Sequence, residues 1–274
     1  MSIELAPHNK LGLSLASPLM AGSGALGFGE AWPPGVGPEL FAALVTPPIT
    51  FQPRRGNAPP RLAEIPGGFI LATGDHNPGL RRLLRDDAAG WARLGIPALV
   101  ALAASAPEDW DRLAAALEDQ PAVAGLELHL PAQATARDAG LWTANVRRSC
   151  QLPLLVKLPA ANAELLVEAC LHAGADALVA ATAPVGAAPA LAEETAVVTG
   201  PVGGPAALPF TLAALAAVLA QAAGAPVIAA GGITRPADAL RCLRMGAAAV
   251  QVRSVLWTNP AAVAEIRRAV TEGG

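Results

Sequence analysis

Short apolar segments alternate along the chain with longer segments whose apolar residues recur at helical spacing. The apolar segments predict eight strands, at residues 18–21, 43–46, 98–102, 125–130, 154–158, 177–181, 227–230 and 248–252. The longer segments predict helices at residues 78–94, 107–117, 135–149, 163–173, 209–223, 236–245 and 260–270. Several of these helices begin with proline, which the first turn of a helix tolerates.

This alternation is typical of repeated βα units and predicts an α/β fold. We expect a (β/α)8 TIM barrel that forms a single domain over residues 1–274 and begins with a short N-terminal β-hairpin. The segments 98–103 and 226–230 are apolar throughout, as parallel strands buried on both faces are. A doubly wound open sheet uses the same alternation, so the pattern alone leaves that fold open.

Composition narrows the functional classes. The chain has 274 residues, of which 53% are hydrophobic and 15% are charged, and its net charge is −3. These values exclude a disordered chain, and they give no excess of basic residues that would indicate nucleic-acid binding. Cys150, Cys170 and Cys242 match neither a metal site nor a disulfide framework, so we expect no metal and a reducing, cytoplasmic setting.

The uncharged stretch 195–234 raises the question of a membrane span. Prolines and glycines interrupt it, and its longest continuous part is rich in alanine, whereas a span needs about 20 strongly apolar residues in a row. The first residues also lack the basic and apolar regions of a secretion signal. We therefore expect no membrane association.

Two turns follow the last two predicted strands. Gly231 and Gly232 come after the seventh strand, and Arg253 and Ser254 come after the eighth. Barrels of this type often bind phosphate at these two turns, where backbone N–H groups and a helix N-terminus attract an anion. The turns therefore predict a phosphate site, and a tight turn that happens to use glycine is the structural alternative.

Lys157 lies within the apolar segment 154–158. A buried ammonium group needs an anion or a polar ligand beside it, because its desolvation is costly. One interpretation is a ligand at the barrel mouth. The other is a structural salt bridge with Glu127, which stands near the end of the preceding predicted strand.

Six segments in order carry a likeness to a known family. They are LASPLMAGSGALGFG at 15–29, RGNAPPR at 55–61, GDHNPG at 74–79, VKL at 156–158, GGI at 231–233 and GAAAVQV at 246–252. Together they resemble the class 1 dihydroorotate dehydrogenases. The resemblance implies an FMN-binding barrel that oxidises dihydroorotate to orotate in pyrimidine biosynthesis.

The resemblance also implies roles for single residues. Lys157 would act in catalysis by stabilising the reduced flavin, and Asn77 would bind the substrate. The implied cofactor-binding residues are Gly22, Ser23, Gly24, Lys157, Thr182, Gly203, Gly204, Gly231, Gly232, Arg253 and Ser254. The family has glycine where Arg253 stands, so this arginine either pairs with the phosphate or disturbs its site.

The position of the family's catalytic base differs in this chain. Family members carry cysteine or serine there, whereas Ala132 cannot take a proton. Two further polar positions of the family align with Pro47 and Ala181. His129 and His76 are the available substitutes, since a neutral imidazole accepts a proton near neutral pH, and we assign His129 to the catalytic set. The structural alternatives are a strand-end histidine and a solvated loop residue.

Three functions fit these observations. The first is an FMN-dependent oxidoreductase, and the second is a non-catalytic flavin- or phosphate-binding barrel that acts as a regulatory or partner subunit. The third is a flavin-free isomerase or lyase in which Lys157 donates a proton or forms an imine. The segment 27–30 resembles the form of the family that works with an electron-transfer subunit carrying FAD and an iron–sulfur cluster, and the family implies a homodimer.

Overall fold

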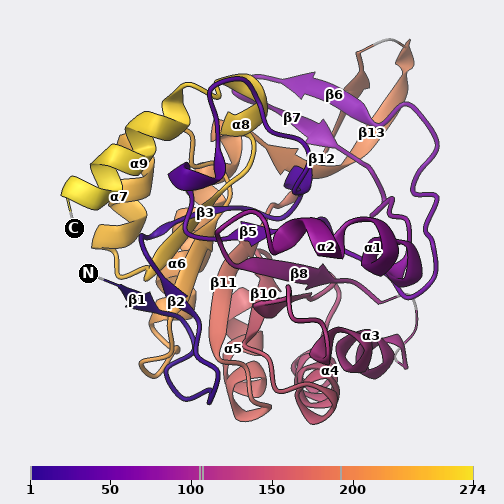
Figure 1. The fold of residues 1–274 in the computed structure, drawn as a ribbon. Helices are drawn as coiled ribbons and strands as arrows, with labels where there is room; N and C mark the ends of the chain where they lie inside the picture. The colour runs from indigo at the N-terminus through magenta and orange to yellow at the C-terminus, as the bar shows by residue number, and fades with distance from the viewer. Residues whose placement is uncertain (1, 105, 107, 192, 274) are drawn as a thin grey trace.

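A closed barrel of eight strands forms the centre of the computed structural model, which describes residues 2–104, 106, 108–191 and 193–273 (Figure 1). In barrel order the strands are β3 (Leu19–Ala21), β5 (Leu44–Val45), β8 (Ala98–Leu102), β9 (Gly125–His129), β10 (Leu154–Pro159), β11 (Ala177–Thr182), β14 (Val227–Ala230) and β15 (Ala249–Val252). Neighbouring strands are parallel, and β15 pairs with β3 to close the ring. The predicted TIM barrel is confirmed, and the open sheet is excluded.

Helices surround this barrel (Figure 1). They are α1 (Leu80–Asp86), α2 (Ala88–Trp91), α3 (Asp109–Glu118), α4 (Ala136–Ser149), α5 (Ala163–His172), α6 (Leu208–Leu219), α7 (Pro236–Arg244), α8 (Val255–Thr258) and α9 (Ala262–Glu272). No helix in the described part of the chain combines the length and the apolar character that crossing a bilayer requires.

Two predicted helices differ most from the observed ones. The helix predicted at 78–94 is two short helices that meet at Asp87, and it starts late because Gly79 has a φ of 79°. The helix predicted at 209–223 ends at Leu219, and Ala223 has a φ of 49°, which an α-helix cannot contain. For the helix predicted at 107–117, the expected first residue, 107, lies outside the described residues.

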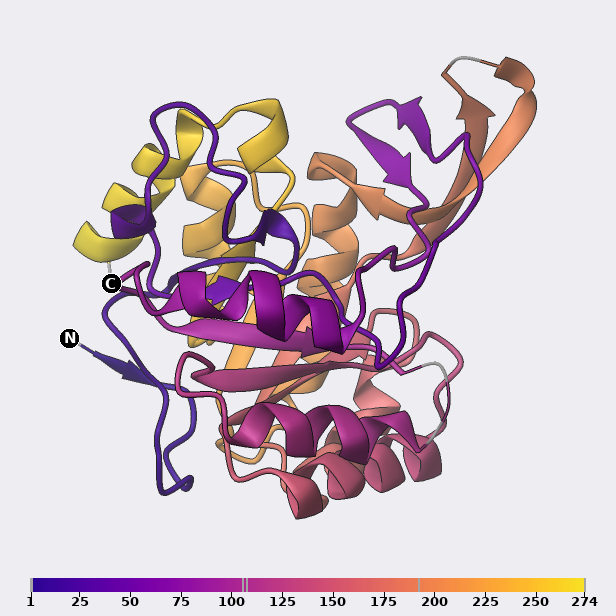
Figure 2. The ribbon, with the colours of Figure 1, turned by 45° about the vertical axis from the view of Figure 1, so that its right-hand side comes forward.

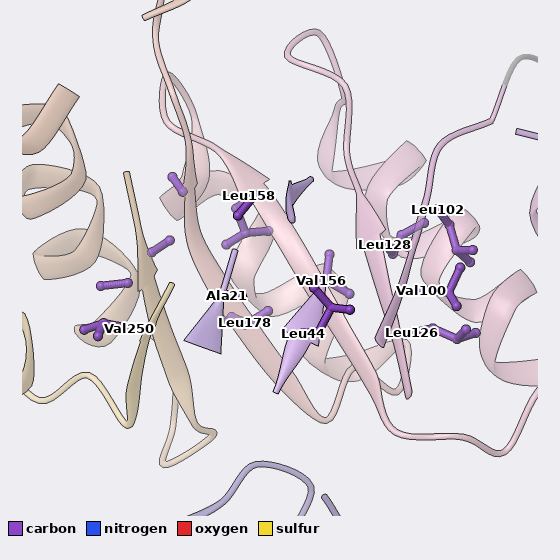
Figure 3. Close-up of a cluster of buried hydrophobic side chains, with 14 of the residues drawn as sticks. Ala21, Leu44, Val100, Leu102, Leu126, Leu128, Val156, Leu158, Leu178 and Val250 are labelled. Carbon is purple, nitrogen blue, oxygen red and sulfur yellow. The ribbon is translucent and has the colours of Figure 1, made fainter. Parts of the chain in front are cut away.

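The strands bury both of their faces. Residues such as Leu126, Leu128 and Val250 belong to the cluster that packs between barrel and helices, shown in Figure 3. The alternate residues, such as Leu99, Leu155 and others, form a second cluster inside the barrel. Side chains therefore fill the lower part of the barrel, as in other folds of this type.

The predicted N-terminal hairpin is present. It consists of β1 (Ile3–Glu4) and β2 (Ser14–Leu15), which are antiparallel. Leu5, Leu13 and Leu15 are buried in the cluster inside the barrel. Because β2 leads into β3, the hairpin covers the N-terminal ends of the strands, which leaves the C-terminal ends for a ligand.

A second sheet, which the sequence did not predict, stands beside the barrel mouth (Figure 2). It contains β6 (Leu62–Ile65), β7 (Gly68–Leu71), β12 (Val185–Ala190) and β13 (Glu193–Gly203), in the order β12-β13-β7-β6. Its strands are antiparallel and bury a small apolar cluster that includes Ile70 and Val198. Three shorter elements complete the fold: β4 (Ala25–Phe28) and the 3-10 helices at Pro38–Leu40 and Pro205–Ala207.

Candidate active site at the barrel mouth

A layer of polar side chains crosses the barrel just below its mouth. Glu127 and His129 come from β9, Lys157 from β10 and Gln251 from β15. Lys157 and Gln251 each stand two positions after a residue of the cluster inside the barrel, so their side chains point inward. Glu127 also points inward, because it pairs with Leu155 of that cluster on the neighbouring strand. Since β9 and β15 lie on opposite sides of the barrel, the layer spans its interior.

These side chains form one hydrogen-bonded network. Lys157 Nζ donates to Glu127 Oε1 at 3.3 Å and to Gln251 Oε1 at 2.9 Å. Gln251 Nε2 donates to Glu127 Oε2, which closes a ring of three side chains. His129 Nε2 lies 2.6 Å from Glu127 Oε1. The predicted salt bridge between Lys157 and Glu127 is therefore present.

The network determines the charges of its members. Burial by itself raises the pKa of Glu127, but the Lys157 charge and the hydrogen bonds of His129 and Gln251 outweigh it and lower this pKa to about 2. Burial lowers the pKa of His129, and Lys157 acts in the same direction against Glu127 and Asp75. Glu127 is therefore ionised and His129 is neutral at pH 7.

The salt bridge leaves part of Lys157 available. An ammonium group has three N–H donors, and two of them meet Glu127 and Gln251. The third has no acceptor among the described residues. Lys157 also retains 8% exposure, whereas Glu127 is fully buried. Lys157 can therefore donate to a ligand at the mouth while it keeps its counter-ion.

The two turns predicted to bind phosphate lie side by side, because Ala230 of β14 pairs with Gln251 of β15. Among the described residues, the backbone N–H groups of Gly231, Gly232, Arg253 and Ser254 donate to no protein acceptor. The Ser254 side chain is buried beside these amides. Four unpaired amides and a hydroxyl on adjacent turns fit the oxygens of a phosphate group.

Glycine is required at Gly232 by the fold itself. Its φ is 70°, and a Cβ there would stand 2.6 Å from the Cα of Leu208, at the start of α6. Gly22, at the end of β3, donates its N–H to the carbonyl of Val252 and lies against Gln251. Close packing against Leu208 and against Gln251 therefore accounts for the absence of a side chain at these two positions.

The remaining cofactor positions are less uniform. Ser23 is buried and donates its hydroxyl to the carbonyl of Thr46, so it shapes the loop after β3. Thr182 ends β11 at the mouth and is half-buried. Gly203 and Gly204 lie against β7, where a Cβ on Gly203 would enter the ring of Phe69. Packing against β7 alone accounts for these two glycines.

Comparison with known proteins now gives the family. The family profile described as "Dihydroorotate dehydrogenase" matches residues 6–273. The chain belongs to the dihydroorotate dehydrogenase family. Three similar relatives are each named "Dihydroorotate dehydrogenase B (NAD(+)), catalytic subunit". The Pelobacter propionicus protein is 36% identical over 94% of this chain and 90% of its own. The Desulforudis audaxviator protein is 33% identical (93% and 88%), and the Geotalea daltonii protein is 31% identical (99% and 92%).

Arg253 stands where the family resemblance implies a glycine. Its guanidinium carbon lies 4.8 Å from the ring centroid of Trp257, and the Trp257 ring in turn lies 6.1 Å from that of Phe69. Trp257 also donates its Nε1–H to the carbonyl of Ala25. The arginine side chain is exposed and lies over the Trp257 ring, so its bulk is accommodated beside the predicted phosphate site.

Asn77, the predicted substrate ligand, is buried and engaged within the protein. Its Oδ1 accepts from the backbone N–H groups of Thr50 and Gly79, and its Nδ2 donates to the carbonyl of Asp75. The amide therefore joins the loop after β5 to the start of α1. This arrangement leaves little hydrogen-bonding capacity for a substrate.

The residues at the altered family positions lie around the mouth. Ala132 is exposed in the loop after β9, Pro47 contacts Gly24, and Ala181 is buried near the end of β11. His76 is exposed on the loop before α1, while His129 joins the polar network. Of the two candidate bases, only His129 has a partner that fixes its ring among the described residues.

Sequence reasoning gave Glu127 only a salt-bridge role and did not single out Gln251. The alternation of side chains along a strand could have identified both residues. Glu127 and His129 are two residues apart on one strand, and so are Ala249 and Gln251, which places each pair on one face. Polar residues at inward positions of a barrel strand are the signal that could have identified them.

Proposed function

We propose that this protein is an FMN-dependent oxidoreductase that oxidises a CH–CH bond and serves as the catalytic subunit of a larger enzyme. One observation carries the proposal. The ammonium group of Lys157 is buried and ion-paired but keeps one N–H donor without a partner among the described residues, and it lies at the same end of the barrel as four unpaired backbone amides. Family membership supports the same reaction class.

The residues fit FMN at two ends. Gly231, Gly232, Arg253 and Ser254 would hold the phosphate through backbone amides and a hydroxyl. Lys157 would donate to the ring edge that gains negative charge. Bound FMN supplies the hydride acceptor, and a nearby cation makes reduction more favourable.

His129 is the proton acceptor in this proposal. It is neutral at pH 7, and its contact with Glu127 leaves one ring nitrogen without a partner among the described residues. Ala132 cannot perform this step. A positioned base contributes about 10²- to 10⁴-fold to such a rate, so a chain without one would be slow.

Dihydroorotate is the reference substrate, and the substrate site has changed relative to the family pattern. Ala132, Pro47 and Ala181 replace polar residues, and the Asn77 amide is engaged internally. Each lost hydrogen bond to a polar substrate weakens its binding. We therefore expect weak binding of dihydroorotate and better binding of a less polar cyclic dihydro compound.

The relatives are named as catalytic subunits of an NAD(+)-dependent enzyme. We extend this to the chain and propose an electron-transfer subunit, carrying FAD and an iron–sulfur cluster, as its partner, together with a homodimeric arrangement of the chain itself. A flavin-free lyase that forms an imine loses support, because Lys157 Nζ is engaged by Glu127 and Gln251 within the protein. The same contacts are compatible with Lys157 as the proton donor of an isomerase.

A non-catalytic flavin-binding subunit is the second candidate. Two observations favour it: Ala132 at the family's base position, and the internal hydrogen bonds of Asn77. This candidate predicts bound flavin without turnover.

Visible spectroscopy of the purified protein separates the two candidates. We expect a yellow protein whose flavin bleaches when dihydroorotate or a less polar dihydro analogue is added without oxygen. His129→Asn is the matched variant, which should keep the flavin and lose most of the bleaching rate. A colourless protein that does not bind added FMN contradicts both candidates. A flavin reduced by dithionite and by no dihydro compound supports the non-catalytic subunit.

A further inference from the structure

Glu127 contacts every other member of the polar network and is itself fully buried. Its Oε1 accepts from His129 and Lys157, and its Oε2 accepts from Gln251. The two groups that can face a ligand, the ammonium and the imidazole, are thus tied to one carboxylate. Such a group controls both the orientation and the charge of its partners.

The contact also determines where His129 carries its proton. An ionised carboxylate only accepts hydrogen bonds, so the neutral imidazole must be protonated on Nε2, which lies 2.6 Å from Glu127 Oε1. The lone pair then lies on Nδ1, which has no hydrogen-bond partner among the described residues. Carboxylate–histidine pairs in hydrolases work in this way: the carboxylate holds the tautomer and stabilises the imidazolium.

We propose that Glu127 is a positioning residue that holds His129 with Nδ1 as the proton acceptor and stabilises the imidazolium that forms. This inference rests on the proposed function. The substrate C–H bond would break, its proton would go to Nδ1, and its electron pair would form the new C=C bond, while bound FMN would accept the hydride from the adjacent carbon. The positive charge that the His129 imidazole gains then lies next to the ionised Glu127.

The groups that face His129 come from several elements. Glu127, on the same strand, and Asp75, on the loop before α1, favour the charged ring. Lys157 on β10 disfavours it, and Gln251 on β15 is uncharged and acts through Glu127. Removing the Glu127 charge and removing the Lys157 charge must therefore shift the pKa of His129 in opposite directions.

NMR titration of the histidine rings in the full chain tests this arrangement without turnover. The His129→Asn spectrum identifies the His129 signals among those of the four histidines. Wild-type His129 should carry its proton on Nε2. Glu127→Gln keeps the shape of the side chain and should lower the pKa of His129 by about 1 unit or more, whereas Lys157→Met should raise it. A proton on Nδ1 in the wild type, or an unchanged pKa in Glu127→Gln, overturns the inference.

Rapid anaerobic reduction of the bound flavin, measured against pH, supplies the kinetic test. Glu127→Gln should slow reduction by about 10²- to 10⁴-fold. Asp75→Asn is the matched control, because Asp75 is exposed and paired with Arg54, and it should slow reduction by less than about 10-fold. Equal rates in Glu127→Gln and wild type overturn the positioning role and leave the function intact. A shifted His129 pKa without flavin reduction in the wild type overturns the function and leaves the contact intact.

Discussion

Replacing Gly232 by alanine probes the turn on which the phosphate site depends. Gly232 has a φ of 70°, and its added Cβ would stand 2.6 Å from the Cα of Leu208 and closer still to the Leu208 nitrogen. Both atoms are backbone at the start of α6, so no side chain can rotate away. The turn or the helix must move.

Two terms contribute to the cost. A left-handed conformation costs a residue with a Cβ roughly 1–2 kcal/mol. Forcing an extra carbon into a filled space costs about 1–3 kcal/mol more. Gly232→Ala should therefore lower the free energy of unfolding by about 2–5 kcal/mol and weaken FMN retention, because the amides of the turn shift.

Gly35 provides the matched control. It has a similar φ of 75°, is exposed, and has nothing within 4 Å of an added Cβ. Gly35→Ala should cost only the conformational term, roughly 1–2 kcal/mol, and should retain FMN as the wild type does. Denaturant unfolding and flavin content measure both effects. If the two variants lose equal stability and equal flavin, the close approach to Leu208 does not shape this turn.

Three further outcomes concern charged groups. The folded-state pKa of Glu127, about 2, lies below its usual value of 4.5, so the ionised carboxylate stabilises the fold above pH 4.5. This contribution of about 3 kcal/mol is lost as the pH falls towards 2. Glu127→Gln should remove this part of the fall in unfolding free energy at acid pH, and an unchanged pH dependence contradicts the assignment. Lys157→Met leaves the buried Glu127 carboxylate without its counter-ion and should lower the free energy of unfolding by about 3–5 kcal/mol. The double variant Lys157→Met with Glu127→Leu should recover most of this loss. A double variant no more stable than the single one argues against the ion pair. Arg253→Ala and Trp257→Leu should show a coupling free energy of about 0.5–1 kcal/mol in a double-mutant cycle of denaturant unfolding, and purely additive effects would exclude their stacking in solution.

The sequence by itself determined the barrel and the position of its mouth. Each barrel strand overlaps a segment that the apolar pattern predicts, because parallel strands buried on both faces need continuous apolar residues. The turn at Gly231 and Gly232 was also readable, since few residues other than glycine adopt its positive φ. Both signals depend only on residues close together in the sequence, so they can be recognised without knowledge of the fold.

The second sheet was not readable in this way. The segment 185–203 is rich in alanine, glycine and proline, and its strands are stabilised mainly by pairing with each other and with β7. The single helix predicted at 78–94 failed for a related reason. Its period continues through Gly79 and Asp87, where the backbone changes direction.

Apart from the Lys157–Glu127 pair, which the sequence predicted, the polar network was decided by the tertiary structure. Lys157 and Gln251 are 94 residues apart in sequence, and Glu127 and Gln251 are 124 apart, yet closure of the barrel brings them within hydrogen-bond distance. The same holds for Asn77, which the family resemblance implied as a substrate ligand and whose amide contacts Thr50 within the protein. The apolar pattern fixes which faces are buried, but strand register and barrel closure decide which buried polar groups meet, and neither is encoded in local spacing.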